Sequence, residues 1–120
     1  MKESLFILMY ISCTLAITSW SGVATDVVLN DALSSGWNLC WSDLYPDNGT
    51  LLTDIMNMCS GDYIMYGCKQ VDSPTFHIAA YAPRADVFNF YGPGNSDYVT
   101  SNGALWYIDD DKSMGSFNCF

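Results

Sequence analysis

The stretch CSGDYIMYGCK, residues 59–69, places two cysteines around an apolar run and decides how the fold is interpreted. A metal site would need cysteine or histidine pairs at short spacing, and a redox site would need a C-x-x-C turn. Neither pattern is present, and His77 is the only histidine of the chain. We therefore expect Cys59 and Cys68 to take part in structural disulfides.

The beginning of the chain has the layout of a secretory signal peptide. A weakly basic start precedes the apolar segment Leu5–Ile17, and small residues follow up to Ala24, after which cleavage is expected. With about 13 residues, the apolar segment is shorter than the roughly 18–20 that a membrane-spanning helix needs. We predict a signal peptide at residues 1–24 and a single small secreted β-rich domain at residues 25–120. The alternatives are an uncleaved membrane anchor and a buried helix.

Removal of this leader leaves an even number of cysteines, because Cys13 departs with it. Four cysteines in a small secreted domain indicate two disulfides, for which three pairings exist. The preferred pairing joins Cys40 to Cys59 and Cys68 to Cys119. A domain of roughly 100 residues has a limited hydrophobic core and gains stability from such crosslinks.

The composition is strongly acidic, which excludes two classes of partner. The net charge is −9, and every acidic residue except Glu3 is an aspartate. Nucleic acid and anionic membrane surfaces would repel such a chain, so we predict neither as a partner once the leader is cleaved. Aspartate favours turns and caps over helix interiors, which indicates a fold of strands and loops.

Short apolar segments at about ten-residue spacing predict several strands. These strands are expected at residues 36–45, 62–71, 75–82, 87–91 and 104–109. The clearest helix is Thr50–Gly61, with apolar residues at spacings of three and four and Gly61 as a left-handed C-cap. Residues 26–37 form a short helix that ends at Gly36 or a strand, with a linker leading into the domain as the alternative. We expect a mostly β or α+β fold, a small antiparallel sheet or sandwich with one short helix and disulfide crosslinks.

Residues that typically carry catalysis or bind metals do not form a recognisable pattern. His77 lies on a predicted strand, and no G-x-S-x-G elbow accompanies it. Asp109–Asp111 places three carboxylates in a row without the glycine-containing loop of an EF-hand, which favours a solvated acidic loop. We predict no catalytic residue, no metal site and no cofactor. Arg84 is the only arginine and is expected to form a salt bridge with an aspartate.

Tyrosine and tryptophan beside aspartate and asparagine suggest a carbohydrate-binding surface as an alternative. Aromatic faces stack on the C–H groups of sugars, while carboxylates and amides bind hydroxyls. The candidate ligand-binding residues are Trp41, Tyr91, Trp106, Tyr107 and Asp109, with Ca²⁺ as an optional aid. About half of the aromatic rings on alternating strands should instead face the core, Trp106 among them.

A glycosylation sequon lies on a predicted turn. Asn48-Gly49-Thr50 follows Pro46 and Asp47, so we predict an N-linked glycan on Asn48 in a host that attaches one.

The motifs CSGDYIMYGCK, HIAAYAPRADV and SNGALWYIDDDKSMG together resemble an uncharacterised cysteine-containing repeat of predicted secreted proteins from small eukaryotes. The resemblance extends from Leu29 to about Met114 and implies secretion and a shared fold, without an activity. The repeat continues with further cysteines where this chain stops, so either Cys119 takes over a pairing role or the domain is truncated. The matching residues are Cys40, Cys59, Cys68, Ala79, Ala80, Arg84, Asp86, Val87, Asn102, Gly103, Trp106 and Tyr107.

These features predict a secreted, acidic, non-enzymatic glycoprotein domain that binds an extracellular partner or has a structural role. The alternative is a lectin-like carbohydrate-binding module. A small hydrolase built on His77 is the least favoured hypothesis.

Overall fold

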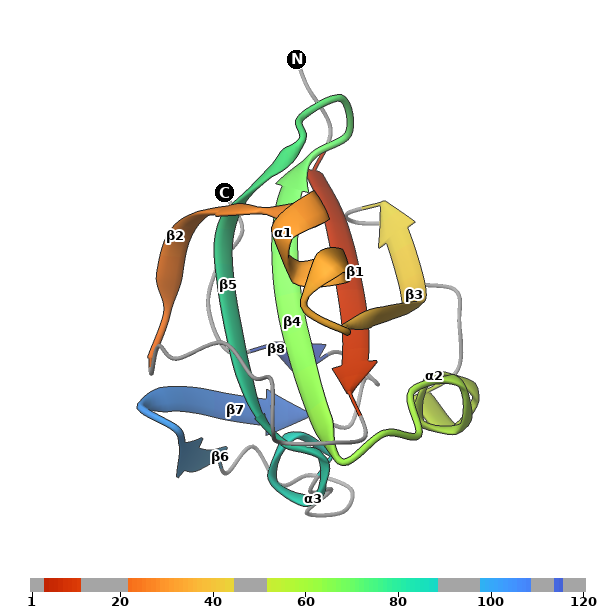
Figure 1. Ribbon diagram of the computed structural model, residues 1–120. Helices are drawn as coiled ribbons and strands as arrows, with labels where there is room; N and C mark the ends of the chain where they lie inside the picture. The colour runs from red at the N-terminus through yellow and green to blue at the C-terminus, as the bar shows by residue number, and fades with distance from the viewer. Residues whose placement is uncertain (1–3, 12–21, 45–51, 89–97, 109–113, 116–120) are drawn as a thin grey trace.

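The computed structural model contains two antiparallel sheets and three short helices in the part of the chain that it describes (Figure 1). The described residues are 4–11, 22–44, 52–88, 98–108 and 114–115. The mostly β fold class is confirmed, with three short helices where one was predicted. The elements are β1 Ser4–Ile11, β2 Ala24–Val28, α1 Leu29–Ser34, β3 Asn38–Leu44, α2 Leu52–Met58, β4 Tyr63–Gln70, β5 Thr75–Pro83, α3 Arg84–Val87, β6 Tyr98–Ser101, β7 Ala104–Ile108 and β8 Met114–Gly115.

The larger sheet has five strands in the order β2-β5-β4-β1-β3, and all of its neighbours are antiparallel. The strands β3, β4 and β5 and the helix α2 were predicted from the sequence, with boundaries within about three residues. Residues 26–37, for which strand and helix both remained open, contain the end of β2 and then α1. Gly36 follows α1 with a φ of 108°, a conformation that suits glycine.

Both faces of the larger sheet are buried. One face carries Met9, Met65 and Phe76 and packs against Ala32 of α1. The other face carries Leu8 and Ile64 and packs against residues of α2, α3 and β7, which form a second core cluster. The sheet is therefore the middle layer of the domain, and its inner strands have continuous apolar sequences because both of their faces avoid water.

The first strand comes from the segment that was predicted to be a leader. Ser4–Ile11 forms β1 between β4 and β3, and Leu8 and Met9 are fully buried there. Ala24, after which cleavage is predicted, lies in β2 opposite Ala79 of β5. The structure is that of the uncleaved chain, so cleavage stays a prediction, and the fold shows which element cleavage would remove.

The smaller sheet contains β6, β7 and β8. A two-residue turn, Asn102-Gly103, joins β6 to β7, and both of its residues have positive φ angles, 49° and 77°. Asparagine and glycine tolerate this conformation at the lowest cost, which is why they favour tight hairpins. The strand β7 was predicted, whereas β6 was not.

Two local predictions are wrong. The strand predicted over residues 87–91 does not begin at Val87, because Arg84–Val87 forms the single helical turn α3. Pro83 ends β5, and the N–H of Arg84 donates to Asp62 O at 2.8 Å. Gly61 has no positive φ angle and is not a left-handed C-cap. A Cβ atom there would lie 2.5 Å from Cδ2 of Tyr10, so this glycine provides space for β1.

Candidate functional site

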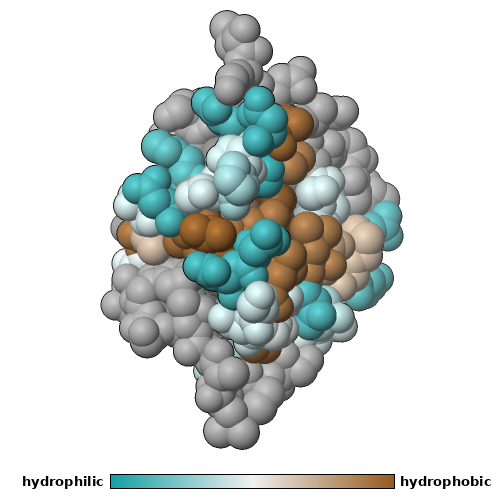
Figure 2. All heavy atoms as spheres, turned by 45° about the horizontal axis from the view of Figure 1, so that its top comes forward, coloured by the Kyte–Doolittle hydropathy of each residue, from teal (hydrophilic) through white to brown (hydrophobic). Residues whose placement is uncertain are grey.

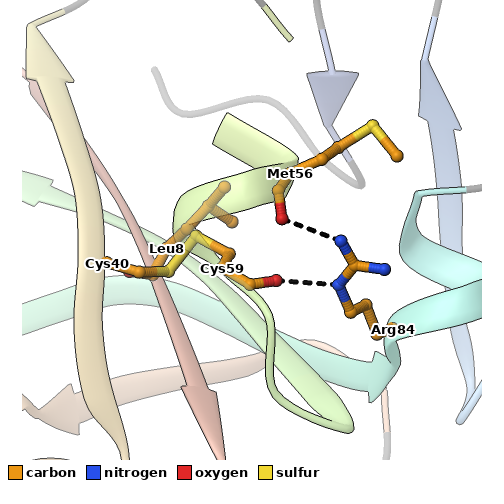
Figure 3. Close-up of a disulfide and its surroundings, with 5 residues drawn as sticks. All are labelled: Leu8, Cys40, Met56, Cys59 and Arg84. Atoms are coloured by element: carbon orange, nitrogen blue, oxygen red, sulfur yellow. Dashed lines mark hydrogen bonds between the residues drawn. A yellow bond between two sulfur atoms is a disulfide. The ribbon is translucent and has the colours of Figure 1, made fainter. Parts of the chain in front are cut away.

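The Cys40–Cys59 disulfide connects β3 to the residue that follows α2 (Figure 3). The two Cα atoms lie 5.3 Å apart, and Cys59 is fully buried beside Ile55, as the helical spacing predicted. This part of the preferred pairing is confirmed. Cys68 is also disulfide-bonded, and its partner lies outside the described residues, as does Cys119.

A β-bulge in β3 turns Cys40 toward its partner. The register between β1 and β3 shifts after Leu8, which leaves Cys40 without an opposite residue. Cys40 and Trp41 are consecutive, yet both pack against the same core cluster, which a regular strand would not allow. The sulfur of Cys40 lies 3.3 Å from the carbonyl oxygen of Leu8, so the disulfide lies against β1 (Figure 3).

Arg84 binds the C-terminal end of α2 (Figure 3). Its Nε donates to Cys59 O at 2.8 Å, and a terminal nitrogen donates to Met56 O at 2.7 Å. The guanidinium also lies 5.2 Å from the centre of the Phe88 ring. The salt bridge predicted for Arg84 is replaced, among the described contacts, by bonds to main-chain carbonyls that the end of a helix leaves unpaired.

The motif residues downstream of Arg84 join the two sheets. Ser101 Oγ donates to Asp86 Oδ2 at 2.6 Å, and Asn102 Nδ2 donates to Tyr81 O at 3.0 Å. The indole N–H of Trp106 donates to Ser101 O at 3.1 Å. The polar groups of these side chains find their hydrogen-bond partners within the fold, so the motif has a structural explanation.

The candidate sugar-binding residues are not assembled into one described surface. Trp106 is 1% exposed and lies in the core, as the alternative of a packing residue anticipated. Trp41 is partly buried, and its indole N–H has no acceptor within the described part of the chain. Tyr91 and Asp109 fall outside the described residues, and the structure describes only the backbone of Tyr107, in β7. Asn48 also lies outside.

The polar groups of the described residues do not form a recognisable catalytic or metal-binding cluster. His77 is exposed on β5, and its ring has no hydrogen bond within residues 4–11, 22–44, 52–88 and 98–108. No group of three or more His, Cys, Asp or Glu residues able to hold a metal ion occurs among the residues with described positions. Likewise, no helix in those ranges is long and apolar enough to cross a membrane.

Lys69 is a buried cation that the sequence analysis did not single out. It is 7% exposed at the end of β4, and its Nζ donates to the carbonyl oxygens of Gln70 and Val71 at 3.1 and 3.0 Å. Because the ammonium binds the turn that leads into β5, its role is structural. The sequence did not predict this contact, because Lys69 lies inside an apolar strand.

Apolar side chains also reach the surface. Figure 2 shows apolar atoms gathered across the middle of one face, between hydrophilic residues. Exposed apolar atoms are common on soluble domains, so this face does not by itself define a binding site. The large apolar residues with exposed side chains are Val23, Val28, Leu33, Leu39, Met58, Val71 and Leu105.

Comparisons with known proteins provide no further assignment. No protein-family model matches the chain, and neither the curated proteins nor the solved structures contain a match.

Proposed function

We propose that this chain is an exported, disulfide-crosslinked β domain that acts by binding a partner or as a structural extracellular component. The observation that carries the proposal is the Cys40–Cys59 disulfide, which connects an edge strand to the core. Disulfides persist in oxidising compartments and are rare in the cytosol, where thiols are kept reduced. The leader-like residues 1–24 supply a route of export.

The side-chain contacts support a non-catalytic role. Arg84, Asp86 and Asn102, which lie in the most distinctive motifs, each bind another part of the fold. A catalytic residue would instead direct its polar atoms toward a substrate or toward a second catalytic group. The exposed and isolated His77 offers no such pair among the described residues.

Mass spectrometry of the secreted protein tests the proposal. The protein is expressed in a eukaryotic secretion host and alkylated without reductant, and its intact mass is then measured. We expect a chain that begins at Thr25, has no alkylated thiol, and carries a glycan on Asn48. Retention of the protein in the cytosol with freely alkylated Cys40 and Cys59 would refute the proposal. An Asn48→Gln variant is the control for the glycan mass.

Carbohydrate binding is the second candidate, and Trp41 is the described residue that favours it. A buried donor without an acceptor costs about 1–3 kcal/mol, which a ligand hydroxyl would recover once the Trp41 side chain turns outward and exposes its indole N–H. A glycan array with and without a chelator tests this function. We expect selective binding that Trp41→Ala abolishes, with Leu105→Ala as an exposed control. Absence of binding to all glycans would leave the structural role.

A further inference from the structure

The position of β1 within the larger sheet has the properties of a binding site for a strand. All eight residues of β1 pair with β4, from Ser4 opposite Gln70 to Ile11 opposite Tyr63. On its other side β1 pairs with β3, from Leu5 opposite Leu44 to Tyr10 opposite Asn38. The walls of this position are therefore two strands, β4 and β3, with an antiparallel strand between them (Figure 1).

The occupant of this position must be apolar on both faces. Ile7, Met9 and Ile11 belong to the core cluster under α1, where they lie with Trp37. Leu8 belongs to the opposite cluster and is fully buried there. A strand with alternating polar residues would place polar side chains into one of the two clusters without partners.

The two walls remain connected when β1 is absent. β4 is paired with β5 on its other side, and the Cys40–Cys59 disulfide attaches β3 to the segment that leads into β4. At one end of the position, Gly61 leaves the space into which Tyr10 packs. A Cβ atom at Gly61 would also lie 2.9 Å from the carbonyl oxygen of Ile11.

Cleavage of the leader has to precede folding. The Ala24–Thr25 bond lies inside β2, and both residues pair with β5 in the folded chain. A peptidase needs an accessible, extended substrate, which the paired strand does not offer. A chain cleaved during export would thus fold after Ser4–Ile11 has been separated from it.

We propose that the position between β3 and β4 is a strand-binding site for an extended apolar segment of a second polypeptide chain. The proposal rests on the export and cleavage proposed above. The partner segment has the chemistry of β1: eight residues, antiparallel to both walls, apolar on both faces, with an aromatic residue next to Gly61. Its main-chain groups complete the ladder of β4, and its side chains supply selectivity.

A strand-replacement experiment on the full-length chain tests the proposal. A protease site is inserted within residues 12–21, and the folded, oxidised protein is cut there. It is then unfolded in urea without reductant, separated from the released N-terminal fragment by gel filtration, and refolded with an excess of a fluorescent peptide that carries residues Ser4–Ile11 between lysine tails. Native mass spectrometry gives the stoichiometry, and fluorescence anisotropy gives the affinity.

We expect one peptide per chain and a higher melting temperature of the refolded protein. A peptide with Leu8→Lys should bind at least tenfold more weakly, because Leu8 is fully buried in the core. A peptide with Ser4→Lys is the matched control, since Ser4 is the first residue of the strand, and it should bind like the original.

Three outcomes would overturn the proposal. The Leu8→Lys peptide could bind as tightly as the original peptide, or the protein refolded without peptide could melt at the same temperature as the protein refolded with it. The third outcome is retention of the uncut leader in secreted protein. The first two readouts do not depend on export. A cytosolic, reduced protein would therefore refute the proposed function and leave the peptide result to be judged separately.

Discussion

Strands β1 and β4 are neighbours with the same environment, yet the sequence predicts a strand for β4 and an export signal for β1. They pair along their whole lengths, and both bury side chains in the two core clusters. β4 is enclosed by turn signals, with Gly61 and Asp62 before it and Asp72, Ser73 and Pro74 after it. β1 begins near the first residue of the chain and is followed by the small residues of the predicted cleavage site.

This comparison shows the limit of hydrophobic periodicity. A strand that is buried on both faces loses its alternation and becomes a continuous apolar run, which is also the composition of a leader. Flanking residues then decide the interpretation. The sequence around β4 predicts a strand, whereas the sequence around β1 predicts export, and the full-length fold includes both segments.

Matched truncations in the two strands give the largest expected effect. Leu8 and Ile64 are fully buried in the same cluster, so Leu8→Ala and Ile64→Ala should each lower the free energy of unfolding of the full-length chain by about 2–5 kcal/mol. In secreted protein that begins at Thr25, only Ile64→Ala should have an effect. Urea denaturation of both forms measures this. A full-length Leu8→Ala protein with unchanged stability would show that β1 is not a central strand.

Replacement of both Cys40 and Cys59 by serine should lower the free energy of unfolding by about 3 kcal/mol. The two residues are 19 positions apart, and the chain-entropy model gives this value for loops of similar length. The loss should be greater in the cleaved form, where β3 has lost its only described strand neighbour. Urea denaturation with and without reductant provides the measurement. Reductant should lower the free energy of unfolding less in the double variant than in the original chain, because the double variant has no Cys40–Cys59 bond to lose.

Arg84 tests a contact that does not involve β1. Arg84→Met keeps an apolar stem but removes both donors to α2, so we expect a loss of about 1–3 kcal/mol. Arg84→Lys should lose less than Arg84→Met, because its ammonium can keep one of the two bonds, although it cannot reproduce both bonds of the planar guanidinium. The loss should be the same with and without the leader. Thermal unfolding of both forms checks this, and a difference between them would show that the bonds of Arg84 to α2 depend on β1.

The smallest effect is expected in the second sheet. Gly103 has a φ of 77°, so Gly103→Ala should cost about 1 kcal/mol through backbone strain. Gly103→Asn should cost less, since asparagine tolerates the left-handed conformation. Both values come from thermal unfolding of the full-length chain, in which the N–H of Gly22, within the predicted leader, donates to Asn102 O at 2.6 Å. Equal stability of all three proteins would mean that the turn differs from the one described.

Local signals explain which parts of the fold were predictable. The apolar face of α2 and the strand patterns of β4 and β5 each depend on neighbours in sequence. The role of Gly61 depends on Tyr10, and the bonds of Arg84 depend on the end of α2, so distant contacts determine both. α3 was missed because a strand was predicted over residues 87–91 and no helix was predicted before it.

The candidate ligand-binding residues show the same division. The sequence identified the aromatic residues, but burial of Trp106 follows from the packing of β7 against the larger sheet. The pairing of Cys40 with Cys59 was one of three possibilities, and the β-bulge that brings these residues together has no signal in the sequence.

The contacts of Lys69 and Arg84 determine how well the folded domain resists a protease. Trypsin cleaves after lysine and arginine, and the chain has only four such residues. Lys69 is buried with its ammonium on two carbonyls, and the guanidinium of Arg84 is held by α2. Folded protein should thus withstand cleavage after Lys69 and after Arg84. The appearance of fragments that end at these residues would report the opening of the larger sheet, the middle layer, in real time.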